Sequence, residues 1–224
     1  MVRDVKNFKL PFWICTLNIV FVYAAVIPIN TFTSDILQKK YAINSIQAGE
    51  YFGSVYLIAG LVLPLCGFIV DRCGKLALCM CCATLLNMIA NLMWILLPAE
   101  CAQTDSCHEL VFVPIVLMGV SYGFFAGSGW NAVVYLVDKD KVGTALGLCS
   151  SFQNLGVAIV PPIMGLIKDY NPDKDFGYYW VTRFSFINAT IGLGFGLWLF
   201  IHDLKYNEGI LNMNVQTRNL HFAS

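Results

Sequence analysis

The chain has 224 residues, of which 58% are hydrophobic and only 12% are charged. A soluble domain is usually about a quarter charged, so this composition excludes an ordinary soluble protein and predicts lipid as the solvent for most of the chain. The formal net charge is zero, which argues against a nucleic-acid partner. No segment is strongly basic on one face, which argues against a helix lying on the membrane surface.

Six apolar segments each have about the ~20 residues that cross a bilayer as a helix. The sequence therefore predicts an all-α membrane protein with six transmembrane helices. Pro28, Pro64 and the pair Pro161-Pro162 lie inside spans and predict kinks. The expected spans are 10–32, 48–70, 76–97, 111–136, 143–167 and 181–201, with an N-terminal segment at 1–9 and a polar tail at 202–224 that is expected to be disordered.

The distribution of Lys and Arg predicts the orientation, because cytosolic loops carry an excess of both. This bias places both termini in the cytosol and the loops 98–110 and 168–180 on the opposite side. The richer side carries Arg3, Lys6, Lys9, Arg72, Lys75, Lys139, Lys141, Lys205 and Arg218, and the poorer side carries Lys39, Lys40, Lys168, Lys174 and Arg183.

Two short stretches repeat the pattern P-[LI]-x-G-[FL]-I-x-D. One runs from Pro64 to Asp71 and the other from Pro162 to Asp169, and each closes the second span of a group of three. The predicted orientation puts the two aspartates on opposite sides of the membrane. The pattern therefore predicts two three-helix repeats in inverted orientation, a common build of secondary transporters. The alternative is a coincidental match, since membrane sequences use few residue types.

The loop after the second span contains the most specific motif, G-x-x-x-D-R-x-G-K. It consists of Gly67, Asp71, Arg72, Gly74 and Lys75. The glycines allow a tight turn and close helix approach. Asp71 can pair with Arg72 or face the positive end of another helix. The alternative interpretation is an ordinary basic loop on the cytosolic side.

This motif resembles the signature loop of the major facilitator superfamily, which locks the two halves of those transporters together on the cytosolic side. Residues 5–13, 142–147 and 151–156 resemble the start of the seventh helix and parts of the eleventh helix of the lysosomal dipeptide transporters in that superfamily. The resemblance covers about residues 5–201. It implies one half of the fold, the C-terminal half of a dipeptide uniporter that works by alternating access in the lysosomal membrane.

Charged side chains are missing from the centres of all six expected spans. Glu50 and Arg183 lie near span ends, where a side chain reaches the interface. A zwitterionic peptide needs charged partners at both ends to leave water. If the family function holds, the ionic contacts belong to the other half, and no carboxylate here can couple transport to protons.

Neutral polar and aromatic groups remain as candidates for a substrate cavity. Taken alone, each buried amide is explained more readily by hydrogen bonds between helices. The resemblance moves Trp130 and Gln153 toward the cavity, because their spans correspond to the tenth and eleventh helices of the family. Asn87 and Asn91, one turn apart, are expected to join helices. The full set of cavity candidates is Tyr23, Tyr56, Trp130, Asn131, Gln153 and Asn154.

Small residues recur at every fourth position in three spans, which predicts close helix packing. The three sets are Gly119, Gly123 and Gly127; Gly143, Gly147 and Ser151; and Gly192 and Gly196.

Most of the nine cysteines lie in apolar runs and do not indicate a disulfide framework or a zinc site. Cys101 and Cys107, in the non-cytosolic loop, form a disulfide or stay as free thiols. No metal and no cofactor is expected.

An enzyme is not expected, because no histidine lies inside a span to activate a serine such as Ser128. The leading hypothesis is a transporter half that moves small organic solutes such as a dipeptide. Its partners would be membrane lipid and a second six-helix half, which is another chain, a second copy or a preceding region. By resemblance, a glycosylated lysosomal membrane protein would be an accessory partner. The alternatives are a non-transporting truncated protein that assists assembly or regulation of a full-length transporter and, less favoured, a six-helix receptor.

Overall fold

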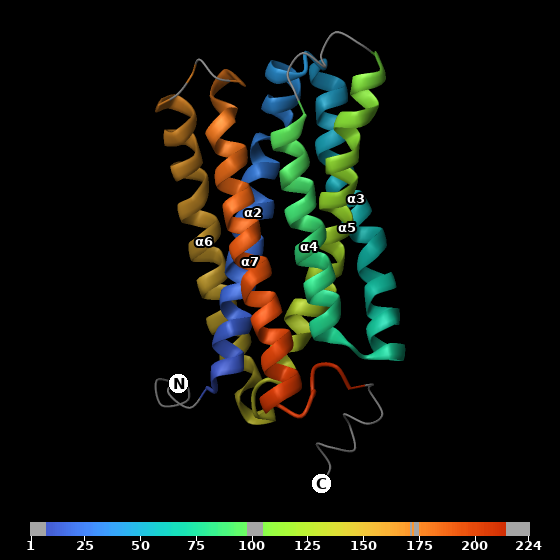
Figure 1. The fold of residues 1–224 in the computed structure, drawn as a ribbon, viewed down its shortest axis with the longest axis vertical. Coiled ribbons are helices and arrows are strands. Elements are labelled where there is room, and N and C mark those ends of the chain that lie inside the picture. Colours follow the sequence, from blue (N-terminus) through green and yellow to red (C-terminus); the bar gives the residue numbers. More distant parts are fainter. Residues whose placement is uncertain (1–7, 98–104, 171, 173–174, 214–224) are drawn as a thin grey trace.

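The computed structural model describes residues 8–97, 105–170, 172 and 175–213. Within them, six helices are long and apolar enough to cross a membrane, which confirms the predicted fold class. They stand side by side in one bundle (Figure 1). The elements are α2 (Leu10–Lys40), α3 (Ser45–Cys73), α4 (Leu76–Leu96), α5 (Asp105–Tyr135), α6 (Val142–Tyr170) and α7 (Tyr178–Tyr206), with 3-10 turns η2 (Lys139–Lys141) and η3 (Asp175–Gly177).

Several helices continue beyond the predicted spans. α2 continues to Lys40, and α5 already begins at Asp105, inside the segment expected to be a loop. Hydropathy marks only the part of a helix that suits hydrocarbon, whereas backbone hydrogen bonding continues into the polar interface. Each helix also continues through its prolines, including Pro114, which lies inside α5 but outside the set expected to cause kinks.

The helix order produces two trios of opposite orientation. α3 ends at the end of the bundle where α2 begins, whereas α6 ends at the opposite end (Figure 1). The aspartates of the repeated pattern therefore lie at opposite ends, as predicted. The packing follows the same pseudo-symmetry, in which α2, α3 and α4 correspond to α5, α6 and α7. The contact of α2 with α7 corresponds to that of α5 with α4, and the contact of α3 with α5 corresponds to that of α6 with α2.

Local signals explain where the helices begin and end. The Asn44 side chain accepts a hydrogen bond from the Gln47 amide at 2.9 Å and caps the start of α3. Gly74 closes α3 with φ 69° and ψ −126°, a conformation that favours glycine. Gly177, with φ 84°, precedes α7, and an added Cβ there would lie 2.6 Å from the Lys168 carbonyl oxygen.

The tail differs from the expected disorder over residues 202–213. Leu211 is fully buried, and its carbonyl accepts a hydrogen bond from the Leu76 amide at 2.7 Å. The buried Asp203 carboxylate accepts bonds from the Leu211 amide at 3.1 Å and from Asn212 Nδ2 at 2.9 Å. The expectation of disorder is wrong here because the buried Leu211 side chain and the hydrogen bonds of the Asp203 carboxylate hold this polar segment against the bundle. Residues 214–224 lie outside the described residues.

Burial differs strongly between helices. In the most apolar stretch of α2, 72% of the residues are buried, against 22% in α3 and 17% in α6. α2 is therefore central, and it contributes to both hydrophobic clusters, through Phe12 and Ile19 near one end and Ile36 and Leu37 near the other. α3 and α6 leave most of their side chains uncovered by this chain.

Candidate functional site

An aromatic cluster joins three of the predicted cavity residues. The indole of Trp130 on α5 donates a hydrogen bond to the Tyr23 hydroxyl on α2 at 2.9 Å. Tyr122, also on α5, lies edge-on to both Tyr23 and Tyr56, with ring centroids 5.8 Å and 6.3 Å apart. Sequence reasoning missed Tyr122, although it lies eight residues before Trp130 and hence on a similar face of α5.

A shallow cavity of about 210 Å³ lies beside this cluster, between α3 and α5. Tyr56, Tyr122 and Gly123 are among its walls, and Tyr56 is 44% exposed. Pockets that enclose small molecules usually have about 300–1,000 Å³. This cavity is therefore too small to enclose a small molecule by itself, and it suits one side of a larger site that a second set of helices completes.

The predicted amides are not gathered around the aromatic cluster. Asn131 is exposed and donates to the Gly127 carbonyl of its own helix at 2.6 Å, and Asn154 is exposed with its Nδ2 3.4 Å from Ser150 Oγ. Gln153 is buried on the inner face of α6. α6 and α3 lie on opposite sides of the bundle (Figure 1). The candidates thus divide between an aromatic wall on α2, α3 and α5, the exposed Asn131 on α5, and Gln153 and Asn154 on α6.

Asn91 joins helices, as predicted, whereas Asn87 bonds only to Asn91 within α4 and its buried Nδ2 has no hydrogen-bond partner among the described residues. Asn91 Nδ2 donates to Asn87 Oδ1 at 2.9 Å, and the Ser185 hydroxyl of α7 lies 2.6 Å from Asn91 Oδ1. The same hydroxyl lies 2.9 Å from the Ala25 carbonyl of α2. These bonds connect α4, α7 and α2 in the buried centre.

The signature loop is exposed at the end of the bundle where α2 begins. Asp71 and Arg72 are exposed, and no ion pair joins them or connects either to another described residue. The Arg72 guanidinium instead lies 5.3 Å from the Phe68 ring. The Asp71–Arg72 pair suggested by the sequence is therefore not formed, because adjacent residues on a helix point in different directions. Both charges remain available to another body.

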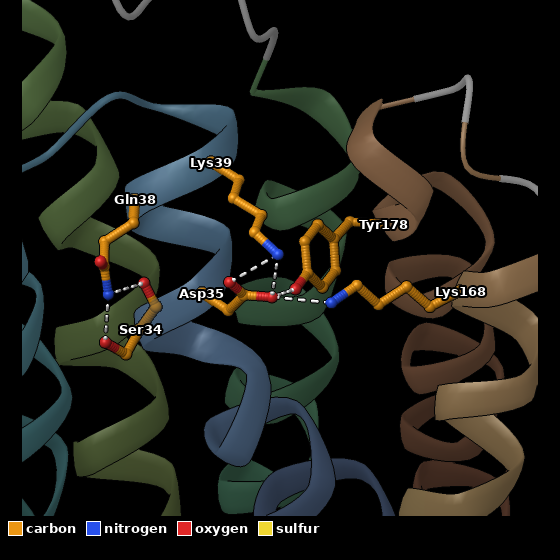
Figure 2. A network of polar contacts seen from close by, with 6 residues as sticks. All are labelled: Ser34, Asp35, Gln38, Lys39, Lys168 and Tyr178. Atoms are coloured by element: carbon orange, nitrogen blue, oxygen red, sulfur yellow. Dashed lines mark hydrogen bonds and ion pairs between the residues drawn. The ribbon is translucent and has the colours of Figure 1, made fainter.

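A polar network occupies the opposite end of the bundle (Figure 2). Asp35 on α2 pairs with Lys39 at 3.1 Å and with Lys168 on α6 at 2.7 Å, and it accepts a hydrogen bond from the Tyr178 hydroxyl on α7. Lys40 pairs with Asp175 at 3.3 Å. These contacts tie α2, α6 and α7 together. The spacing of Asp35 and Lys39 could have been noticed, but the partners on α6 and α7 are set by the tertiary structure.

The small-residue sets divide into packed and open ones. An added Cβ at Gly123 would lie 2.7 Å from the Ala59 carbonyl oxygen, and one at Gly192 would lie 3.0 Å from Val22 Cγ2. At Gly143 and Gly147 it would meet nothing within 4 Å. The expectation of close packing is therefore correct for α5 and α7 and is not met by this chain for α6. Four glycines of α3 are also open: Gly49, Gly53, Gly60 and Gly67.

The described cysteines are free, and the described residues include no group of three His, Cys, Asp or Glu side chains suited to a metal ion. Cys101 lies outside the described residues, and for Cys107 only its position in the first turn of α5 is described. Their disulfide stays a prediction.

Comparison with known proteins identifies the family. The family model of the Major Facilitator Superfamily matches residues 12–215. The chain belongs to the major facilitator superfamily. The family predicted from the signature loop is thus confirmed, and the six helices correspond to a half-length member of it.

Curated members of the superfamily resemble the chain along most of its length. It is 34% identical over 220 residues to the lysosomal dipeptide transporter MFSD1 of Homo sapiens, covering 96% of the chain and 43% of that protein. It is 28% identical over 223 residues to the protein of the same name from Danio rerio, covering 96% and 43%, and 30% identical over 216 residues to that from Gallus gallus, covering 96% and 45%. The chain thus spans less than half the length of these curated relatives.

Proposed function

We propose that this chain is the C-terminal half of a transporter of small organic solutes, and that its substrates are dipeptides. It would work by alternating access against a second six-helix body, which is another chain, a second copy or a preceding region. The observation that carries the proposal is the pair of uncovered faces on α3 and α6, together with membership of the family.

Open glycines are concentrated on these two helices, with four on α3 and three on α6, against one, Gly194, on α7. Lipid tails do not require small residues, whereas a neighbouring helix does, because small residues let two backbones approach closely. Gly60 on α3 and Gly147 on α6 have the same type of small surface as Gly123, but no partner in this chain. A second bundle that packs on α3 and α6 would supply the missing contacts.

The signature loop supports the same arrangement. Asp71 and Arg72 are exposed without an ion-pair partner among the described residues. In a two-half transporter they would reach the opposing half when the cytosolic side closes. Breaking those contacts would then allow the halves to rock apart.

The dipeptide assignment draws on the relatives' name and on the chemistry of the cavity wall. The wall formed by Tyr23, Tyr56, Tyr122 and Trp130 is aromatic and uncharged. It suits the side chains and the amide of a short peptide, while the charged ends would bind to the second half. No carboxylate is among the described residues of this wall, so we propose uniport rather than proton-coupled transport.

The place of action and a further partner follow by analogy with the relatives. The chain would reside in the lysosomal membrane with both termini cytosolic. The end of the bundle that carries Asp35 and Asp175 would face the lumen and offer the contact site for a glycosylated accessory membrane protein. An enzymatic role is not proposed, because the family carries out transport.

Uptake of labelled dipeptides into vesicles tests the proposal. The chain would be reconstituted alone and with an N-terminal six-helix half from a related transporter, and we expect uptake only with the second half. Gly147→Leu should abolish uptake while the melting temperature of the chain stays unchanged, because this face packs against nothing within the chain. Gly194→Leu, the same change at an open position of α7, is the matched control and should leave uptake unchanged.

Absence of uptake in both preparations would contradict the transporter proposal and favour a non-transporting role in assembly or regulation. Uptake of free amino acids but not of dipeptides would contradict the substrate class alone.

A further inference from the structure

A second cavity lies between α6 and α7, at the end of the bundle that carries the Asp35 network. It has a volume of about 470 Å³. Its walls include Leu166 and Tyr170 from α6 and Trp180, Arg183 and Ile187 from α7. Apart from the Arg183 side chain and the Tyr170 hydroxyl, these walls are aliphatic or aromatic. The space is therefore an apolar groove with one cation near it.

The groove faces outward and lies on a different side of α6 from the open glycines. Leu166 is 71% exposed and Ile187 is 54% exposed. At ~3.6 residues per turn, Leu166 and Tyr170 lie about 100° and about 140° around the helix from the face that carries Gly147 and Gly165. A second half that packs on the glycine face would leave the groove open to lipid.

Arg183 differs from the other described cations at this end of the bundle. Lys39 and Lys168 pair with Asp35, and Lys40 pairs with Asp175. No carboxylate pairs with Arg183 among the residues that the structure describes. Its Nη1 donates to the Tyr179 carbonyl of its own helix at 2.8 Å, and its guanidinium lies 3.4 Å from the Tyr179 ring. A guanidinium has five N–H donors, so this fixed side chain retains donors for an anion.

The depth of these groups matches the layers of a membrane leaflet. α7 begins at Tyr178, so Arg183 lies ~8 Å along the helix axis from its start, and Ile187 lies ~6 Å deeper. Trp180 and Tyr170 border the groove near the same end, as aromatic side chains do at the level of lipid headgroups. A cation near the interface and an apolar channel leading inward complement a phosphate and the acyl chain attached to it.

We propose that the groove between α6 and α7 binds an anionic phospholipid, with the phosphate on the Arg183 guanidinium and one acyl chain along Leu166, Trp180 and Ile187. The guanidinium matches phosphate oxygens in a bidentate manner. The bound lipid would fill the space between two helices that otherwise make few direct contacts with each other. This inference requires only that the chain resides in a membrane and is independent of the transported solute.

Native mass spectrometry of the full chain, released from nanodiscs that contain phosphatidylglycerol and phosphatidylcholine, tests the proposal. We expect one retained phosphatidylglycerol per chain, preferred over phosphatidylcholine. Arg183→Gln should lower its retention about tenfold, and Arg183→Lys should restore part of it. Lys139→Gln removes an exposed cation in η2, at the opposite end of the bundle, and should retain the lipid as the unchanged protein does.

A second variant tests the acyl-chain part of the site and does not depend on the charge. Ile187→Trp should fill the groove and displace the lipid while Arg183 is still present. Inorganic phosphate at the same concentration should not compete, because it lacks the chain. Retention of lipid by both Arg183→Gln and Ile187→Trp would overturn the proposal, as would full competition by inorganic phosphate. A second copy of the chain bound in place of lipid, and lost in Ile187→Trp, would also overturn it.

Discussion

The glycines of α5 and those of α6 have the same spacing but opposite surroundings. Gly119, Gly123 and Gly127 lie against α3, where an added Cβ would come within about 3 Å of its side chains or backbone. Gly143 and Gly147 face open space. The comparison shows that a row of small residues predicts that another helix can approach this face closely, but does not predict which helix it is. In α5 the partner is within this chain, and in α6 we propose that it is the second half of the transporter.

The largest expected effect comes from adding a side chain to the glycine face of α5 that packs against α3. Gly123→Leu would push α3 away from α5, because the new Cβ would lie 2.7 Å from the Ala59 carbonyl oxygen and 2.9 Å from Val62 Cβ. We expect a loss of folding free energy of about 3 kcal/mol, or complete loss of the folded chain. Thermal unfolding in detergent measures the effect. Gly147→Leu is the control and should unfold at the same temperature as the unchanged chain, and equal destabilisation by both variants would abolish the comparison.

Truncation of buried and exposed leucines extends the comparison from small residues to large ones. Leu211→Ala removes a fully buried side chain that anchors the tail to the start of α4, and we expect a loss of about 2–3 kcal/mol. Leu61→Ala on α3, which is 66% exposed, should change stability by less than about 0.5 kcal/mol. Urea or thermal unfolding of both variants checks this. If the tail does not contribute to stability, Leu211→Ala and Leu61→Ala will have indistinguishable melting temperatures.

A smaller effect is expected from removing one charge at each end of the bundle, where Asp35 is paired and Asp71 is not paired with any described residue. Asp35→Asn removes the charge that pairs with Lys39 and Lys168, and we expect a loss of about 1 kcal/mol because the carboxylate is partly exposed. Asp71→Asn should leave unfolding unchanged, since the described residues contain no ion-pair partner for Asp71. In the reconstituted two-half transporter the order should reverse, with Asp71→Asn lowering dipeptide uptake about tenfold. Unchanged uptake would indicate that the loop does not act between halves.

A similar expected effect concerns the hydrogen bond inside the aromatic wall. Tyr23→Phe and Trp130→Phe each break the 2.9 Å hydrogen bond between the two side chains, which should cost about 1 kcal/mol of stability, and Trp130→Phe should cost more because the smaller ring also loses packing. Combining them should add little further loss, because the same bond is removed in both variants. Unfolding of the two single variants and the double variant gives the coupling energy. Strictly additive losses would show that the bond does not contribute to the packing of α2 against α5.

Sequence reasoning was most successful where one local property decides the outcome. The number and order of the helices follow from apolar length, because a backbone in lipid must satisfy its own hydrogen bonds. The opposite orientation of the two trios follows from an odd number of crossings in each. The role of Asn91 was also predictable, since a buried amide in an apolar helix needs a partner, but Asn87 bonds only within its own helix.

Features that depend on partners far apart in the sequence required the tertiary structure. Tyr122 joins the aromatic wall only because α3 and α2 bring Tyr56 and Tyr23 to either side of it. Asp35 meets Lys168 and Tyr178 across three helices. The order of residues 202–213 depends on Leu211 reaching the start of α4, which no local composition signals.

The sequence by itself thus determined a six-helix membrane bundle, its inverted trios and the exposed signature loop, because hydropathy, chain direction and turn residues act within one segment at a time. Only the tertiary structure decided which glycine faces are covered, which polar groups meet and where an apolar groove remains between α6 and α7. Those outcomes are set by distances between segments, and a linear pattern of residues does not contain them.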